Sequence, residues 1–115
     1  MTITPYSTAA LKSAHLVSDQ ILMGSTEEAL QLMVDCYYQG FDRIILQREN
    51  IHTEFFDLKN GMAGEILQKF ANYRMQLRII GDFAATPSPS LQAFIAESNR
   101  GRTVRFVKDL EEALQ

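Results

Sequence analysis

The feature that most constrains the fold is the alternation of short apolar runs with segments of helical periodicity. Apolar or alternating runs lie at residues 44–46, 77–80 and 103–107, and apolar residues recur at helical spacing between them. Short runs of this kind are typical of strands in a buried sheet, and helices between them imply crossover connections between parallel strands. The sequence therefore predicts an α/β domain with a mostly parallel central sheet.

The first helix has the clearest boundaries. Ser25 and Glu28 stand at the two ends of a capping box, in which the Ser25 hydroxyl accepts a backbone N–H and Glu28 reaches back. Gly40 stands where a helix C-terminus favours a residue that tolerates positive φ. The apolar stripe between these signals has the spacing of one helical face and comprises Leu30, Met33, Val34 and Tyr37.

Two further helices and a short terminal one are expected after it. The second follows the sequence FFDLKNG at 55–61 and carries its apolar stripe over residues 63–71. The segment 84–90 contains two prolines, so we expect neither helix nor central strand there, and Ser90 is the predicted N-cap of the third helix. Asp109 is the predicted cap of the terminal helix.

The N-terminal part carries weaker signals. We expect residues 1–7 to be frayed and short strands at 8–13 and 20–23 to form an antiparallel hairpin. The chain shows no repeat, linker or low-complexity tract, so residues 1–115 are predicted to form a single domain. The predicted fold is an α/β sandwich of element order β-β-α-β-α-β-α-β-α.

Charge is distributed unevenly along the chain. Residues 1–68 carry net −5, residues 69–108 net +5, and the tail from Asp109 adds −3, for −3 in all. The acidic total argues against a dedicated duplex-DNA-binding protein. The basic segment is interpreted as a solvated face that complements the acidic part. The alternatives are RNA contact through residues 69–108 or an anion-binding surface, which would comprise Arg74, Arg78, Arg100, Arg102 and Arg105.

Cysteine content and hydropathy indicate the expected cellular compartment. Cys36 is the only cysteine, which excludes an internal disulfide and fits a reducing compartment; we expect it to be a small core residue. No signal peptide or apolar stretch of membrane-spanning length is recognised, so the expected location is the cytoplasm.

No established catalytic or cofactor motif occurs in the sequence. Phosphate-binding loops, dinucleotide fingerprints, zinc-protease helices, nucleophile elbows and paired CxxC motifs are all missing. The absence of these motifs makes an enzyme less expected. No cofactor, catalytic residue or metal ligand is assigned.

The carboxyl ends of the parallel strands are the expected functional edge, because ligands of open α/β sheets collect there. His52 follows one strand and Asp82 another, and both are polar groups suited to acid–base chemistry or ligand binding. Each has a simpler interpretation as a hydrogen-bonded or capping loop residue. The full candidate edge comprises His52, Phe56, Asp57, Lys59, Asp82, Asn99 and Arg100.

Five blocks of sequence stand out along the chain: FFDLK at 55–59, AGEILQKF at 63–70, NYR at 72–74, IGDF at 80–83 and ESNRG at 97–101. With these blocks in this order, the chain resembles the bacterial domain of unknown function 4180 family (DUF4180). The family typically has His-Pro-Asp-Phe-Phe where this chain has HTEFF at 52–56, so the loop proline is missing. The resemblance covers residues 20–107 and implies no activity.

The element order is also similar to the STAS (anti-sigma-factor antagonist) architecture, in which a loop serine before a helix is phosphorylated. The corresponding segment 57–62 contains neither serine nor threonine, so such a switch is not expected. The favoured hypothesis is a non-enzymatic regulatory or protein-interaction module, with a homodimer or protein partner possible. The alternative is a small-molecule or anion-binding protein, possibly an enzyme, with its site around His52 and Asp82.

Overall fold

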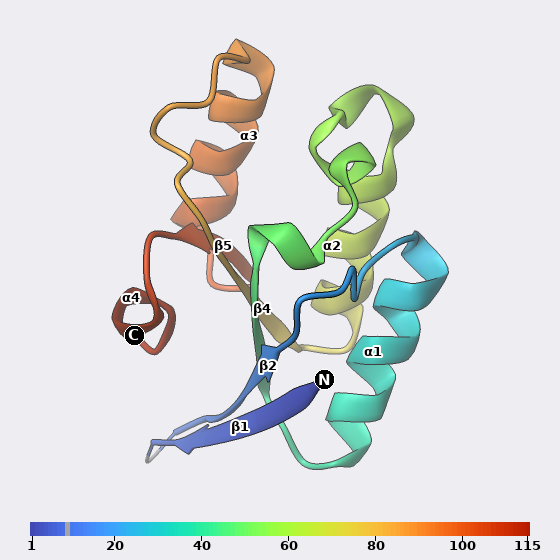
Figure 1. Ribbon diagram of the computed structural model, residues 1–115, viewed down its shortest axis with the longest axis vertical. Coiled ribbons are helices and arrows are strands. Elements are labelled where there is room, and N and C mark those ends of the chain that lie inside the picture. The colour runs from blue at the N-terminus through green and yellow to red at the C-terminus, as the bar shows by residue number, and fades with distance from the viewer. Residues whose placement is uncertain (9) are drawn as a thin grey trace.

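The order of the strands across the sheet is the same as their order along the chain, β1-β2-β3-β4-β5. The computed structural model describes residues 1–8 and 10–115 (Figure 1). The strands are β1 (Thr2–Ser7), β2 (Lys12–Val17), β3 (Arg43–Gln47), β4 (Gln76–Ile80) and β5 (Val104–Val107). The helices are α1 (Thr26–Tyr38), α2 (Met62–Asn72), α3 (Pro89–Arg100) and α4 (Leu110–Ala113).

Pairing in the sheet confirms the predicted fold class. β1 and β2 are antiparallel, whereas β2, β3, β4 and β5 are parallel to one another. One helix connects each parallel pair and α4 follows β5, which is the predicted element order. The sheet is therefore mixed, with the antiparallel hairpin at one edge.

The hairpin lies nearer the N-terminus than predicted. Residues 2–7, expected to be frayed, form β1, and the second strand lies at 12–17 instead of 20–23. The expected strand at 8–13 includes Ala9, which lies outside the described residues. Thr2, Ile3, Thr4 and Tyr6 have strong strand propensity, and Pro5 is tolerated because β1 is an edge strand.

The helices begin where side chains satisfy free backbone N–H groups. Ser25 Oγ accepts from Glu28 N at 3.1 Å, while Glu28 Oε1 accepts from Gly24 N at 3.1 Å, one residue before the expected partner. Asp109 caps α4 by accepting from Glu112 N at 2.8 Å. Both predicted caps are therefore confirmed.

The start of α3 corrects a prediction. Ser88, not Ser90, is the N-cap, and its Oγ accepts from Leu91 N at 3.2 Å. Pro89 is the first residue of the helix, although the segment 84–90 was expected to exclude helix. Proline is favoured at this position because its missing N–H would have no intrahelical partner.

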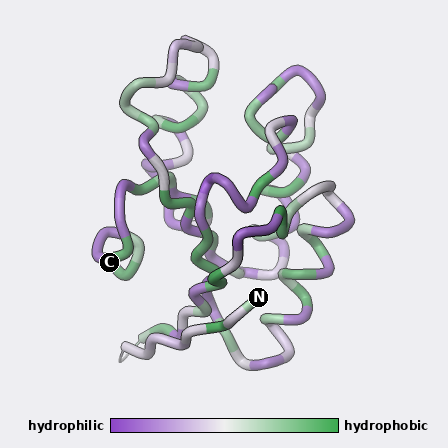
Figure 2. Tube along the Cα trace, in the orientation of Figure 1, coloured by the Kyte–Doolittle hydropathy of each residue, from purple (hydrophilic) through white to green (hydrophobic). Residues whose placement is uncertain are grey.

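Helices α1, α2 and α3 pack on one face of the sheet and enclose the main core. Figure 1 shows α1 and α2 on the side of the sheet opposite α4. Hydrophobic residues concentrate in the central strands and alternate with hydrophilic ones along α1 (Figure 2). Strand residues that face these helices include Leu16, Ile44, Leu46, Leu77, Ile79 and Phe106.

The opposite face, here called the open face, has much less cover. A small second cluster joins Ile45, Ile80 and Val107 to Ala113 of α4, with Leu110 and Leu114 alongside. The side chains that alternate with the core residues point to this face, and three of them are Arg43, Arg78 and Arg105. Three arginine side chains thus point to the face of the sheet on which the short helix α4 packs.

Cys36 is buried in the main core, as expected. Burial, and then the nearby charge of Asp35, raise the pKa of its thiol to about 11, so the thiol stays protonated at neutral pH. Within residues 1–8 and 10–115, every helix is too short or too polar to serve as a bilayer span.

Candidate functional site

The predicted functional edge is built from three 3-10 turns and the loop after β4. The turns span Arg48–Asn50, Thr53–Phe56 and Leu58–Asn60. In doubly wound sheets a ligand crevice opens where the strand order reverses and neighbouring helices leave to opposite faces. The strand order here never reverses, so the carboxyl edge lacks that crevice.

His52 and Asp57 both take part in the backbone structure of this edge. His52 Nδ1 accepts from Glu54 N at 3.0 Å, so the ring holds the first residues of the turn that follows. Asp57 Oδ1 accepts from Lys59 N at 3.4 Å at the start of the next turn. Both residues therefore cap turns, and His52 retains Nε2 for another partner.

Asp82 and Asn99 meet beside β5. Both line a cavity of about 300 Å³, and His52 is not among its lining residues. Asn99 also ties α3 to the outer strand, since its Nδ2 donates to Phe106 O at 3.2 Å and its Oδ1 accepts from Phe106 N at 2.8 Å. The structure thus brings Asp82 together with Asn99 rather than with His52.

The other three candidates are spread along the molecule. Arg100 forms an ion pair with Glu97 at 3.3 Å on the exposed surface of α3, and such pairs contribute little to stability. Lys59 is exposed at the tip of the loop before α2. Phe56 is half-buried and packs against the guanidinium of Arg48, 4.9 Å from its ring centre.

A second cluster, which we call the arginine pocket, lies on the open face at the amino end of the parallel strands. It is a cavity of about 300 Å³. Strand register brings its residues together, because Arg43 is opposite Gln76 and Arg78 is opposite Arg105. The lining residues are Leu11, Arg43, Gln76, Arg78, Arg102, Arg105 and Gln115.

Neutral groups hold the two buried arginines in place. Arg43 is 3% exposed and Arg78 2% exposed. Gln76 Oε1 lies between them and accepts from Arg43 Nη2 at 2.7 Å and from Arg78 Nη2 at 2.9 Å. Arg43 Nη1 also donates to Ala113 O of α4 at 3.0 Å, and Arg78 Nη1 donates to Arg102 O at 3.1 Å.

No Asp or Glu side chain of the described residues balances the positive charge of the pocket. No Asp or Glu oxygen in residues 1–8 and 10–115 lies within 4 Å of Arg43, Arg78, Arg102 or Arg105. Arg43 Nη2 also donates to Gln115 O at 3.2 Å. Arg78 Nε is buried and has no hydrogen-bond partner among the described residues. Burial, followed by the charges of Arg43 and Arg105, lowers the pKa of Arg78 to about 10, and burial also lowers that of Arg43. Both guanidiniums remain charged at neutral pH.

Three of the seven residues that line this pocket were predicted from the sequence. Arg78, Arg102 and Arg105 were among the five arginines of the anion-binding alternative, whereas Arg74 and Arg100 lie outside the pocket. Arg43 and Gln76 were missed. A signal was present, because RII at 43–45, RII at 78–80 and RFV at 105–107 repeat an arginine two residues before an apolar residue of the same face.

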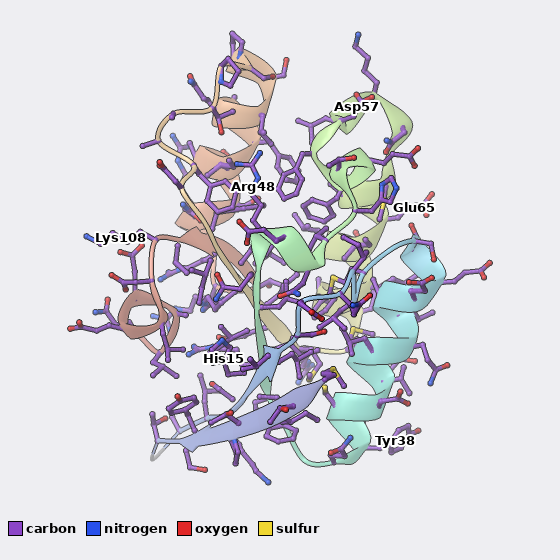
Figure 3. The ribbon with its side chains drawn as sticks, viewed as in Figure 1. His15, Tyr38, Arg48, Asp57, Glu65 and Lys108 are labelled. Carbon is purple, nitrogen blue, oxygen red and sulfur yellow. The ribbon has the colours of Figure 1, made fainter. Side chains whose placement is uncertain are left out.

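His15 also lies on the open face of the sheet, where it pairs in register with Ile45. It lies in β2, is half-buried, and its ring centre is 6.3 Å from that of Tyr6 on β1. Figure 3 shows His15 on the side of β2 toward α4, and Arg48 and Asp57 at the other end of the molecule. Burial lowers the pKa of His15.

Neither cluster is a metal centre. The described part of the chain brings no three His, Cys, Asp or Glu side chains into a group that could hold a metal ion. The arginine pocket contains only donors and neutral acceptors, which suit an anion and repel a cation.

Comparison with known proteins gives a family. Residues 8–115, almost the whole chain, match the family described as a domain of unknown function, DUF4180. No curated protein and no solved structure matches the chain.

Proposed function

We propose that this chain, which belongs to the DUF4180 family, binds a small oxyanion in the arginine pocket. This proposal depends on one observation: Arg43 and Arg78 are almost fully buried, and no Asp or Glu side chain of the described residues pairs with them. A buried charge is costly unless it is paired, and native proteins rarely leave one without compensation. An anion in the cavity would supply that compensation.

The donors indicate the class of anion. Arginine presents N–H groups in a planar fork that matches the oxygens of phosphate, sulfate or carboxylate. Four arginines line one cavity of about 300 Å³, which favours a compact ligand carrying more than one negative charge. A phosphate or phosphate-like group satisfies both conditions.

The lining favours binding over turnover. It contains arginine, glutamine and leucine side chains, and no cysteine, serine, histidine or carboxylate that would act as nucleophile or general base. This supports a non-enzymatic module that responds to an anionic ligand, in line with the regulatory role favoured from the sequence. A cytoplasmic location and a STAS-like relationship remain part of this proposal.

The test is thermal unfolding with sodium sulfate or phosphate against chloride at matched ionic strength. We expect a saturable rise in Tm for the natural protein, because a ligand that binds only the folded state stabilises it. Arg105→Gln should lose this rise. Arg74→Gln and Arg100→Gln are the matched controls, since they delete the same charge outside the pocket and should keep it.

Sulfate also stabilises proteins non-specifically by exclusion from their surface. An equal rise in Tm for the natural protein, Arg105→Gln and both controls would mean that only this general effect operates, and the proposed site would be withdrawn.

A protein-interaction role is the second candidate, and one surface favours it. Tyr37, Tyr38 and Tyr73 are exposed, and their rings pack edge to face with centres 5.5 and 5.9 Å apart. Tyrosine is enriched in protein interfaces. If the protein is dimeric by native mass spectrometry, Tyr38→Ser should shift it toward monomer; an unchanged dimer would place the interface elsewhere.

A further inference from the structure

Arg48 is another arginine without an Asp or Glu partner among the described residues, and it lies at the carboxyl edge of the sheet. It directly follows β3, and no Asp or Glu oxygen of the described chain lies within 4 Å of it. Its guanidinium lies 4.9 Å from the ring centre of Phe56 and 5.4 Å from that of Phe83. Two aromatic faces therefore hold the charge in place without neutralising it.

Gly81 makes this packing possible. A Cβ at position 81 would lie 3.1 Å from Arg48 Cβ and 3.1 Å from Phe83 Cζ, closer than ordinary van der Waals contact. The missing side chain, rather than an unusual backbone angle, therefore lets Arg48 and Phe83 approach each other over the end of β4.

Two cavities meet at Arg48, and together we call them the carboxyl-edge groove. The first, of about 480 Å³, has an apolar part formed by Ile21, Ile51 and Phe56. Ile21 is 49% exposed, which leaves a large apolar side chain facing this cavity without full cover. The second cavity, of about 430 Å³, adjoins Thr86 and Ser88 at the start of α3. The groove therefore has an apolar half and a polar half, with Arg48 between them.

An unpartnered hydroxyl marks the polar half. Thr86 is one of the residues that line the second cavity and is 6% exposed. Its Oγ1 is buried and has no hydrogen-bond partner in the described part of the chain. A buried polar atom in this state is uncommon in a folded protein and calls for a partner. It lies just before α3, whose 12 residues direct the positive end of the helix dipole to the same place.

We propose that the carboxyl-edge groove binds a small monocarboxylate with an apolar body. Its carboxylate accepts from Arg48 and from the Thr86 hydroxyl near the start of α3, and its apolar body fills the space beside Ile21, Ile51 and Phe56. This site is independent of the arginine pocket, which lies at the amino end of the strands on the open face.

Acidic residues around the groove restrict the ligand to one negative charge. Glu49 and Asp57 line the first cavity, and Asp82 lines the second. A second negative charge on the ligand would be repelled by these carboxylates, whereas a single carboxylate is held by Arg48 and the helix terminus. A doubly charged phosphate ester should therefore bind less well than a monocarboxylate with the same phenyl group.

The experiment is an NMR titration with 3-phenylpropanoate, with phenyl phosphate as the doubly charged comparison. We expect saturable shifts at the groove for the carboxylate and binding at least about tenfold weaker for phenyl phosphate. Arg48→Met should weaken carboxylate binding by about tenfold or more, the loss expected for a charge-assisted hydrogen bond. Thr86→Val, which has nearly the same shape, should weaken it severalfold.

Arg74→Met and Arg100→Met are the matched controls, since both residues lie outside the two sites, and they should bind 3-phenylpropanoate as the natural protein does. Three results would each overturn the proposal: no saturable shift at millimolar ligand, equal affinity in Arg48→Met with a native spectrum, or shifts confined to the arginine pocket. Tighter binding of phenyl phosphate at the groove would overturn the monocarboxylate assignment.

Discussion

The two arginine sites of this protein surround their guanidinium groups with different kinds of side chain. In the arginine pocket, Arg43 and Arg78 are buried, both donate to the neutral Gln76 Oε1, and no Asp or Glu side chain of the described residues pairs with them. In the carboxyl-edge groove, Arg48 is half-buried on two aromatic rings, and acidic side chains line the same cavities. The pocket therefore favours a ligand with more than one negative charge. The groove favours a ligand with one anionic group and an apolar body.

The difference shows how each site arises. Strand register creates the pocket, because residues far apart in sequence fall opposite each other across β3, β4 and β5. Packing creates the groove, because Gly81 leaves room for Arg48 and Phe83 to approach. A change in the charge of the pocket should therefore alter both the free energy of unfolding and anion binding. Changes in the groove should alter mainly ligand binding at the groove itself.

Gln76→Glu should produce the largest effect, because it places a carboxylate between the two buried guanidiniums. The side chain keeps its shape, and its contacts of 2.7 and 2.9 Å become charge-assisted hydrogen bonds. We expect the free energy of unfolding to rise by about 2 kcal/mol and sulfate binding to be lost. Urea unfolding and a sulfate titration measure the two results.

Gln68→Glu is the control for that change, since Gln68 is exposed on α2 and the same charge there should alter stability by less than about 0.5 kcal/mol. A destabilised Gln76→Glu that still binds sulfate would contradict the view that the pocket lacks a counter-charge.

Ligand binding at the two sites should respond differently to alkaline pH. Because the pKa of Arg78 is lowered to about 10, raising the pH above that value discharges it in the ligand-free protein. We expect sulfate affinity to be nearly constant between about pH 6 and 9 and to fall by about tenfold by about pH 11. Calorimetric titration measures this step, and Arg78→Met should lack it. Binding of 3-phenylpropanoate at the groove should not follow the same step.

Thr86→Val should stabilise the ligand-free protein and weaken the binding of 3-phenylpropanoate in the groove. A methyl group replaces a buried hydroxyl that has no partner, so the desolvation cost disappears. The expected gain in the free energy of unfolding is about 1 kcal/mol, measured by urea denaturation. Ser90→Val, on the exposed first turn of α3, should show no such gain. A loss of stability in Thr86→Val would mean that the hydroxyl is satisfied.

His15 should give the smallest effect. Its pKa is lowered by burial from 6.5, so the folded state prefers the neutral ring, and this stability is present above pH 6.5. It is lost as the pH falls below 6.5, where the unfolded chain binds the proton more readily. His15→Gln should flatten the decline in Tm between about pH 7 and 5; an identical decline would assign it to other groups.

Local signals in the sequence predicted the fold well. The caps at Ser25 and Asp109, the apolar stripes of the helices and three of the parallel strands depend on neighbours within a few residues. Tyr37 is the exception, since it was predicted in the apolar stripe of the first helix and is 46% exposed. The hairpin was misplaced because an edge strand such as β1 has little apolar patterning of its own. Ser88 was missed because Pro89 was interpreted as a breaker rather than as a first helical residue.

The sites were harder to predict because they depend on register and burial. The sequence contains Arg43, Arg78 and Arg105, but only the pairing of the strands shows that they share one cavity. The predicted edge residues His52 and Asp57 prove to cap turns, and their residue types alone do not distinguish capping from ligand binding. Arg48 and Thr86 carry no motif at all.

The agreement between strand order and chain order has a consequence for synthesis of the protein. Each strand pairs with a neighbour in sequence, so contacts are comparatively local and the sheet can grow as the chain emerges from the ribosome. β5 and α4 come last, and they complete the arginine pocket. Until then Arg43 and Arg78 can stay hydrated, so the growing chain postpones the most unfavourable desolvation until nearly all of its apolar core has formed.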